Sequence, residues 1–175
     1  MKSVALFFII GIFLTGSLSA SVLKEGDLVK NFKILADSGS YISLGDYKGK
    51  WVILYFYPKD DTYGCTKEAK KFSQLKNEFE KLNAVIFGIN KDGIESHKKF
   101  KKKHKLTITL LTDENGEISK YFGVKTFFGM CKRDTILINP EGKVERIYRG
   151  VNPEGNPEDI LNYLKKRRGK DGKAD

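Results

Sequence analysis

The sequence predicts a single α/β domain in which helices flank a mixed β-sheet. The chain has 175 residues, which is enough for one domain and too short for two ordinary ones. Short apolar runs alternate with segments of helical periodicity, and an apparent hairpin follows near the end. Hydrophobic residues make up 40% and charged residues 31%, which suits a soluble globular core and excludes a mostly disordered chain.

The first expected elements are strands. Residues 29–35 and 41–44 alternate around a turn signal at residues 37–40. Residues 51–57 form a continuous apolar run that ends at Pro58. Such a run indicates a central strand buried on both faces.

An amphipathic helix follows a polar loop at residues 59–64. Its apolar residues recur at steps of three and four: Ala69, Phe72, Leu75, Phe79 and Leu82. The next expected elements are a buried strand at residues 84–89, a second helix at 94–105, a strand at 107–111 and a short helix at 117–122.

The last third of the chain predicts a hairpin and a helix. Residues 134–139 and 143–148 are expected strands, joined by the turn Pro140-Glu141-Gly142. Asn156 or Pro157 opens a final helix that is expected to end at about Lys166. This order of elements fits a thioredoxin-like fold best.

The N-terminal segment is predicted to be a secretory signal. Lys2, an apolar run at residues 4–14 and small residues up to Ala20 match its three regions, so we expect a signal peptide at residues 1–20. An uncleaved anchor is the alternative. In both cases the domain, residues 21–168, faces an extracytoplasmic compartment, the periplasm in a bacterium with an outer membrane. Residues 169–175 are expected to be a basic disordered tail.

The positive charge is concentrated in two places. Lys+Arg 32 against Asp+Glu 22 gives a net charge of +10, and basic residues cluster at positions 98–105 and 165–173. We interpret the clusters as a solvated helix face and a frayed tail, with weak attraction to anionic lipid left open. Export and the lack of a recognisable motif argue against nucleic acid as a partner.

One of the two cysteines lies where a reactive thiol is expected. Cys65 follows the central strand, and Thr62 is a candidate N-cap that makes Cys65 the third helical residue. Unpaired backbone N–H groups and the helix dipole favour a thiolate there. Because Glu68 and Ala69 occupy the positions of a second cysteine, Cys-x-x-Cys and Cys-x-x-x-Cys chemistry are excluded. Lone-thiolate chemistry on a small electrophile remains.

The segment around this cysteine resembles the active-site motif of peroxiredoxins, Pro58-x-x-x-Thr62-x-x-Cys65. Residues 44–69 resemble the Q type of that family, the bacterioferritin-comigratory proteins. The run from Arg133 to Gly142 resembles the family's arginine-bearing strand and turn. The resemblance covers nearly all of residues 24–166.

The resemblance implies a thiol peroxidase that needs no cofactor and reduces hydrogen peroxide, with organic hydroperoxides as further candidate substrates. Cys65 would be the peroxidatic cysteine, Thr62 would orient the peroxide, and Pro58 would shield the thiolate. Arg133 would stabilise the thiolate and the leaving oxygen, with Glu68 holding the arginine in place. The implied reductant is a thioredoxin-like protein or a small thiol.

The sequence departs from the family pattern in three places. Tyr63 stands where the family usually has proline, Lys70 stands where many Q-type members carry the resolving cysteine, and residues 94–105 contain no cysteine. Cys131 is therefore the candidate resolving cysteine. Two residues from Arg133 in an expected strand, it should share a face with that arginine and lie near Cys65. It resolves within the chain, pairs across subunits, or is a bystander while an external thiol reduces the sulfenic acid. Monomer and dimer both remain open.

Two further function classes compete with the peroxidase. One is a non-catalytic redox sensor or binding module of the cell envelope, in which oxidation of Cys65 alters a partner contact. The other is a copper-binding envelope protein that uses Cys65 and Cys131, which is weak without a histidine or methionine pair nearby. His97 and His104 lie seven residues apart on one helix face, and we expect packing or solvation for them rather than metal binding.

Overall fold

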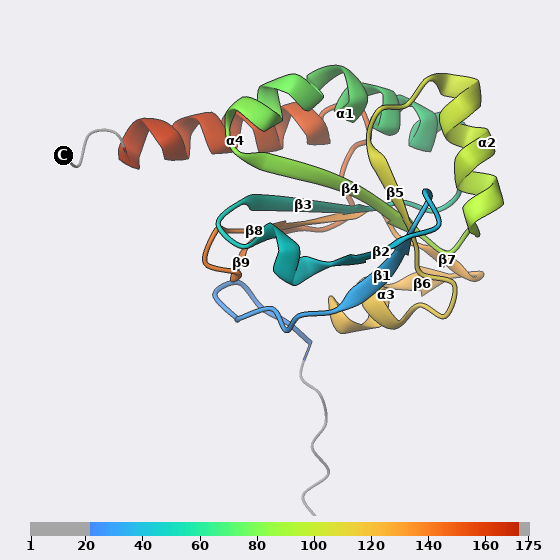
Figure 1. Ribbon diagram of the computed structural model, residues 1–175, viewed down its shortest axis with the longest axis horizontal. Helices are drawn as coiled ribbons and strands as arrows, with labels where there is room; N and C mark the ends of the chain where they lie inside the picture. The colour runs from blue at the N-terminus through green and yellow to red at the C-terminus, as the bar shows by residue number, and fades with distance from the viewer. Residues whose placement is uncertain (1–21, 172–175) are drawn as a thin grey trace, which may run out of the picture.

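The computed structural model describes residues 22–171 and contains the predicted mixed sheet flanked by helices (Figure 1). The seven strands lie in the order β2-β1-β5-β4-β3-β8-β9, with β3, β4 and β5 parallel and the other neighbouring pairs antiparallel. The sheet strands are β1 (Lys33–Ala36), β2 (Tyr41–Ser43), β3 (Trp51–Phe56), β4 (Ala84–Asn90), β5 (Thr109–Thr112), β8 (Asp134–Ile138) and β9 (Val144–Tyr148).

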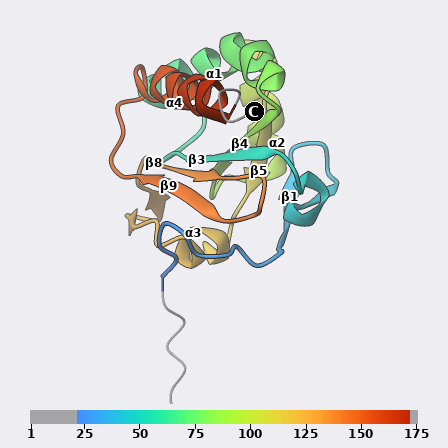
Figure 2. The ribbon, with the colours of Figure 1, turned by 90° about the vertical axis from the view of Figure 1, so that its left-hand side faces the viewer.

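Helices cover both faces of this sheet (Figure 2). The helices are α1 (Tyr63–Lys81), α2 (Ile94–His104), α3 (Glu117–Tyr121) and α4 (Asn156–Asp171), with a 3₁₀ turn η1 (Leu44–Tyr47) after β2. Helices α1 and α4 lie above the sheet in Figure 2, and α3 lies below it. Phe100 joins α2 to the core on the α1 side.

The central strand β3 divides the core in two, because its side chains alternate between the faces. Ile53, Tyr55 and Tyr57 pack on the side of α1, whereas Leu54 and Phe56 pack on the side of α3. All five side chains are buried, which confirms the sequence prediction of a strand covered on both faces.

Helix α1 is the predicted amphipathic helix and places the candidate site. Ala69, Phe72 and Phe79 form its buried face, and the Phe72 ring stacks on Tyr55 with 4.6 Å between ring centroids. This packing fixes the first turn of α1 at the carboxyl end of β3, where sites in open α/β sheets lie.

The structure corrects two expectations near the end of the chain. A small hairpin of β6 (Thr126–Phe127) and β7 (Met130–Cys131) precedes β8, so Cys131 and Arg133 do not share a strand. Helix α4 continues to Asp171, past the expected end near Lys166, so residues 169–171 of the expected tail are helical. The expected signal segment at residues 1–20 and the last four residues of the tail lie outside the described part.

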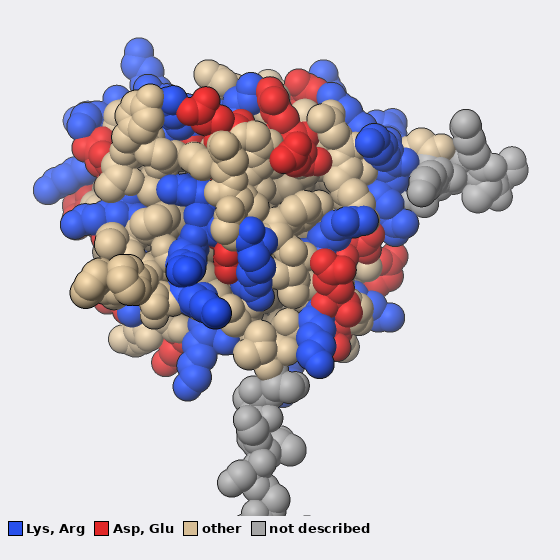
Figure 3. All heavy atoms as spheres, turned by 180° about the vertical axis from the view of Figure 1, so that it is seen from behind, with Lys and Arg blue, Asp and Glu red and all other residues tan. Residues whose placement is uncertain are grey.

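The two basic clusters do not form one surface. Helix α2 and the end of α4 lie at opposite ends of the molecule in Figure 1, and Lys and Arg side chains gather at both ends in Figure 3. Among residues 22–171, no helix has the length and apolar character needed to cross a membrane.

Candidate active site

Cys65 lies in the first turn of α1, at the carboxyl end of β3. Thr62 is the N-cap residue with an extended backbone, φ −86° and ψ 156°, which makes Cys65 the third helical residue as predicted. The Thr62 hydroxyl does not cap the helix and instead donates to the carbonyl oxygen of Lys59 at 3.1 Å. Cys65 is only 1% exposed, so its sulfur is shielded from bulk water.

Arg133 connects the thiol to a buried carboxylate. Its Nη2 donates to Sγ of Cys65 at 3.2 Å, and its Nη1 donates to Oε2 of Glu68. Because an arginine keeps its charge, this hydrogen bond holds a positive charge beside the Cys65 sulfur. Cys65, Glu68 and Arg133 therefore converge, although Arg133 comes from the segment between β7 and β8.

Glu68 holds the arginine from inside the core. Its side chain is fully buried, and burial raises the pKa of this carboxyl to about 7, against the opposing effect of Arg133. Asn156, at the start of α4, donates from Nδ2 to Glu68 Oε1 at 3.0 Å and to Thr135 Oγ1 at 2.8 Å. The sequence marked Asn156 only as a helix opener, and its contact with Glu68 spans 88 positions.

Tyr63, which stands where the family usually has proline, lies next to the site residues Thr62 and Gly64 in the chain. The Tyr63 ring is 78% exposed, and Lys67 Nζ lies 4.4 Å from its centroid while also pairing with Glu154. Gly64 sits beside Arg133, since a methyl group there would lie 3.4 Å from Nη2. Pro58 is half-buried directly after Tyr57, at the start of the loop that leads to Thr62.

Cys131 is on the other side of the sheet. It packs with Leu54 and Phe56, whereas Cys65 packs with Tyr55 and Tyr57, so β3 separates the two thiols. The expected shared face with Arg133 is wrong because the chain leaves β7 at Lys132 before β8 begins. Both cysteines are free thiols.

The surroundings of Cys131 disfavour its thiolate. Its sulfur contacts the Ser119 hydroxyl at 3.2 Å, and the residue is only 2% exposed. Burial raises the pKa of the Cys131 thiol, which keeps it protonated. In this fold Cys131 reaches neither Cys65 nor a second subunit without opening of the core.

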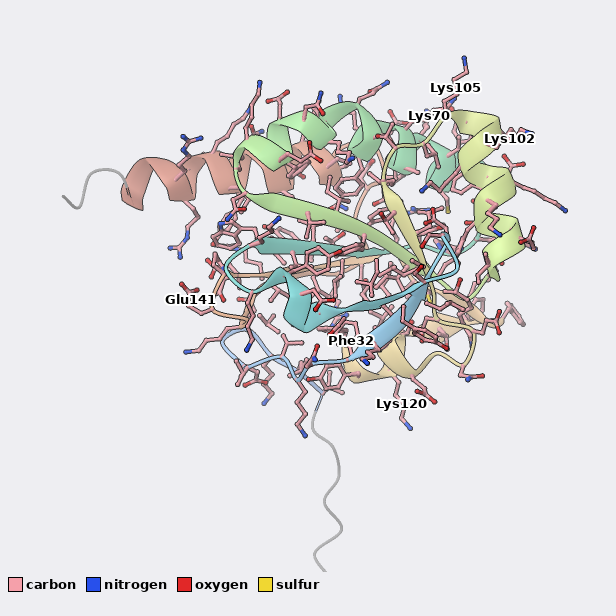
Figure 4. The ribbon with its side chains drawn as sticks, in the orientation of Figure 1. Phe32, Lys70, Lys102, Lys105, Lys120 and Glu141 are labelled. Carbon is pink, nitrogen blue, oxygen red and sulfur yellow. The ribbon has the colours of Figure 1, made fainter. Side chains whose placement is uncertain are left out.

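Lys70 occupies the usual position of a resolving cysteine. It is exposed on α1 and is labelled in Figure 4. Neither α1 nor α2 therefore presents a second thiol to Cys65.

The two histidines are held by neighbouring aspartates of the active-site loop. His97 is fully buried and bonds through Nδ1 to Asp60 Oδ2 at 2.9 Å, while His104 Nε2 lies 2.5 Å from Asp61 Oδ1. No cluster of three or more metal-binding side chains occurs within residues 22–171. Because Cys65 and Cys131 face opposite sides of the sheet, they do not form a shared copper site.

Comparisons with known proteins place the chain in a family. A model of the AhpC/TSA family matches residues 26–147. The chain belongs to this family. Its relatives include the peroxiredoxin Bcp of Bacillus subtilis, 38% identical over 82% of this chain and 96% of that protein. Relatives of this kind identify the protein as a peroxiredoxin of the Bcp or Q type, a thiol peroxidase.

Solved structures of peroxiredoxins share the fold. A mutant of PrxQ from Xylella fastidiosa superposes with a TM-score of 0.80 at 32% identity, over 85% of this chain and 99% of that one. The bacterioferritin comigratory protein of Xanthomonas campestris gives a TM-score of 0.73 at 32% identity, over 78% of this chain and 91% of that one. The thioredoxin-like fold expected from the order of elements is thereby confirmed.

Proposed function

We propose that this peroxiredoxin is an exported peroxidase that reduces hydrogen peroxide and organic hydroperoxides at Cys65 and draws its electrons from an external thiol. The observation that carries the proposal is the hydrogen bond from Arg133 Nη2 to the Cys65 sulfur, at 3.2 Å. It holds a fixed positive charge beside a nucleophile that is shielded from bulk water.

The reaction proceeds in two stages. The Cys65 thiolate attacks the terminal peroxide oxygen, the O–O bond breaks, and the leaving oxygen takes up a proton to become water or an alcohol. Arg133 stabilises the charge that moves onto this leaving oxygen, the Thr62 hydroxyl orients the peroxide, and Pro58 shields the thiolate. An external thiol then attacks the sulfenic sulfur, releases water and forms a mixed disulfide, which a second thiol cleaves to restore Cys65.

An external thiol is proposed as the reductant of the oxidised Cys65 because of the position of Cys131. A disulfide needs Cα atoms within about 7 Å, and the sheet lies between the two sulfurs. For the substrate class, the Xanthomonas relative is described by its alkyl peroxide reduction activity, which supports organic hydroperoxides as substrates here.

Export is proposed from the N-terminal sequence pattern. The family match begins at residue 26, after the apolar run and the small residues that end at Ala20. N-terminal sequencing of the protein recovered from its source cells tests this part. A mature chain that begins near Ser21 in the envelope fraction is expected, and a full-length chain in the cytosol contradicts export.

The enzymatic proposal is tested by peroxide turnover with dithiothreitol as the reductant. Replacing the nucleophile, Cys65→Ser, is expected to abolish turnover, while Cys131→Ser retains it because that thiol lies outside the site. Retained turnover in Cys65→Ser contradicts the proposal. Oxidation of Cys65 in the wild type without repeated consumption of peroxide favours the redox-sensor reading instead.

A further inference from the structure

A buried polar network lies beside the active site and takes no part in the chemistry described so far. Its centre is Asp60, two residues before Thr62 in the loop between β3 and α1. The Asp60 side chain accepts hydrogen bonds from four side chains on three other parts of the fold: Tyr57 Oη at 2.7 Å, Asn90 Nδ2 at 3.2 Å, Ser96 Oγ at 2.8 Å and His97 Nδ1 at 2.9 Å.

The hydrogen bonds assign the protonation of this network. His97 Nε2 is buried and finds no hydrogen-bond partner among residues 22–171, so a proton there would leave a buried donor unsatisfied. The proton therefore sits on Nδ1 and is donated to Asp60. Burial raises the pKa of Asp60, but the hydrogen bonds from His97, Tyr57 and Ser96 outweigh burial and leave it below the ordinary value. Asp60 is thus a carboxylate that accepts a hydrogen bond from the Nδ1–H of His97.

The loop around Asp60 is fixed on its backbone as well. The Asp60 N–H donates to Asp92 Oδ2 at 2.7 Å, and Asn90 Nδ2 donates to the same carboxylate at 2.9 Å. The next residue, Asp61, has a left-handed backbone with φ of 58° and turns its carboxylate outward to Lys103 and His104 of α2. Two consecutive acidic residues therefore join the loop to α2. Asp60 accepts hydrogen bonds from Ser96 and His97 in the interior, and Asp61 pairs with Lys103 and His104 at the surface.

This attachment determines where the Thr62 hydroxyl lies. Thr62 follows Asp61 directly, and its only side-chain hydrogen bond within the described chain is to Lys59, inside the same loop. The Thr62 carbonyl joins the residue to α1, because it accepts from the Thr66 N–H at 2.8 Å, but the hydroxyl itself bonds only to the Lys59 carbonyl among the described residues. The direction of the hydroxyl therefore depends on the loop, and Asp60 holds the loop.

We propose that Asp60 and His97 are positioning residues, which hold the loop at residues 58–62 so that the Thr62 hydroxyl meets a peroxide at Cys65. The inference rests on the proposed function, because it assigns these residues a part in the peroxide step. A buried carboxylate with four donors is rigid, and misplacement of a catalytic group by about 1 Å costs up to about 100-fold in rate.

The first test compares His97→Leu with His97→Asn. Leucine keeps the bulk of the side chain but removes the donor, whereas asparagine retains an N–H close to the position of Nδ1. His97→Leu is expected to slow the second-order reaction of reduced enzyme with hydrogen peroxide by about 10-fold or more, and His97→Asn to restore most of this loss. Alkylation of Cys65 by iodoacetamide, followed by peptide mass mapping, needs no Thr62 hydroxyl and is expected to change by less than about twofold.

A double-mutant cycle tests whether His97 acts through Thr62. If it does, Thr62→Val combined with His97→Leu reacts with peroxide at about the rate of Thr62→Val alone. Fully additive losses overturn the proposal, as does an unchanged rate in His97→Leu. An equal loss in peroxide reactivity and in alkylation also contradicts it, because that pattern indicates general damage to the site.

Two further variants separate positioning from loss of stability. Phe79→Leu weakens the same core at the far end of α1 and is expected to leave the peroxide rate unchanged. If it slows the reaction as much as His97→Leu does, the positioning role is refuted. Should His97→Leu fail to fold, Ser96→Ala removes a single donor to Asp60 and is expected to show a smaller loss with the same sparing of alkylation. A wild-type enzyme inert to peroxide refutes the proposed function itself, whereas a reactive wild type with a normal His97→Leu refutes only this inference.

Discussion

The guanidinium of Arg133 divides its donors between the Cys65 sulfur and the Glu68 carboxylate. A lysine has no planar fork and cannot satisfy both acceptors at once. Arg133→Lys is therefore expected to lower the rate of peroxide reduction by about 100-fold, as for the loss of one charge-stabilising donor. Stopped-flow measurement of Cys65 oxidation checks this. Arg149→Lys, which alters an arginine paired with Asp134, is the matched control, and a normal rate in Arg133→Lys argues against the assigned role.

The raised pKa of Glu68 predicts a specific pH dependence of stability. With a pKa of about 7 in the folded state and about 4.5 in the unfolded state, the folded protein binds an extra proton between these values. The Glu68 contribution to stability therefore falls as the pH rises from about 4.5 to about 7 and is constant above that range.

Urea unfolding of the wild type and Glu68→Gln at several pH values tests this dependence. The difference in unfolding free energy between the two is expected to change across pH 5–7 and to level off above about 7. Glu78→Gln serves as the control, because Glu78 is exposed and its pKa is lowered by the hydrogen bond from Lys165. A difference that stays flat from pH 5 to pH 8 contradicts the prediction.

Some site residues can be predicted from the sequence and others cannot. Cys65, Thr62, Arg133 and Glu68 belong to recognisable motifs, and the structure brings Cys65, Arg133 and Glu68 into contact. Asn156 and the Asp60–His97 pair were not assigned roles, because their contacts join positions far apart in the chain and leave no local spacing. The expectation that Cys131 and Arg133 share a face was wrong. Lys132 and Arg133 lie between β7 and β8, so the alternation of side chains along one strand does not extend from Cys131 to Arg133.

At the scale of elements, the register of the central strands requires a glycine at position 88. Gly88 lies opposite Tyr55 on β3 and Leu110 on β5. A methyl group there would lie 2.5 Å from Tyr55 Oη and 2.8 Å from Leu110 Cδ2. Gly88→Ala is expected to destabilise the protein by about 1–3 kcal/mol through overpacking.

Urea unfolding measures this effect, with Gly169→Ala as the control. Gly169 lies in α4, and a methyl group there meets nothing within 4 Å, so alanine is expected to be neutral or slightly stabilising. Equal stability of Gly88→Ala and the wild type would contradict this prediction, and it would show that Tyr55 and Leu110 can shift to accept the added methyl group.

Most elements were predictable because each has a strong local pattern. Burial of both faces of β3 requires its apolar run, and burial of one face of α1 requires its apolar periodicity. The structure has a strand and a helix at these predicted positions. The β6–β7 hairpin was not predicted, because its turn uses Phe128 and Gly129 with φ of 47° and 75°. Asn-Gly is the usual signal for such a turn, and a phenylalanine in the left-handed region gives no sequence cue.

For the whole molecule, the sheet between the two thiols predicts the product of a single oxidation. After one equivalent of hydrogen peroxide, the intact mass of the monomer is expected to rise by one oxygen, as a sulfenic acid on Cys65. Cys65→Ser is expected to remove this gain, and Cys131→Ser to retain it. Loss of two hydrogens from the monomer would instead reveal a Cys65–Cys131 disulfide, and with it a core that opens during the reaction.

The proposed external reductant predicts a rate law for the enzyme. With no resolving thiol taking part, the oxidised site would be reset only by collision with another molecule, so recovery is expected to be first order in the external thiol. A second peroxide competes for the same sulfenic acid and drives it to the sulfinic state, which thiols do not reverse. Under this proposal, the ratio of thiol to peroxide outside the protein, rather than any internal step, is expected to set how many cycles each molecule completes before inactivation.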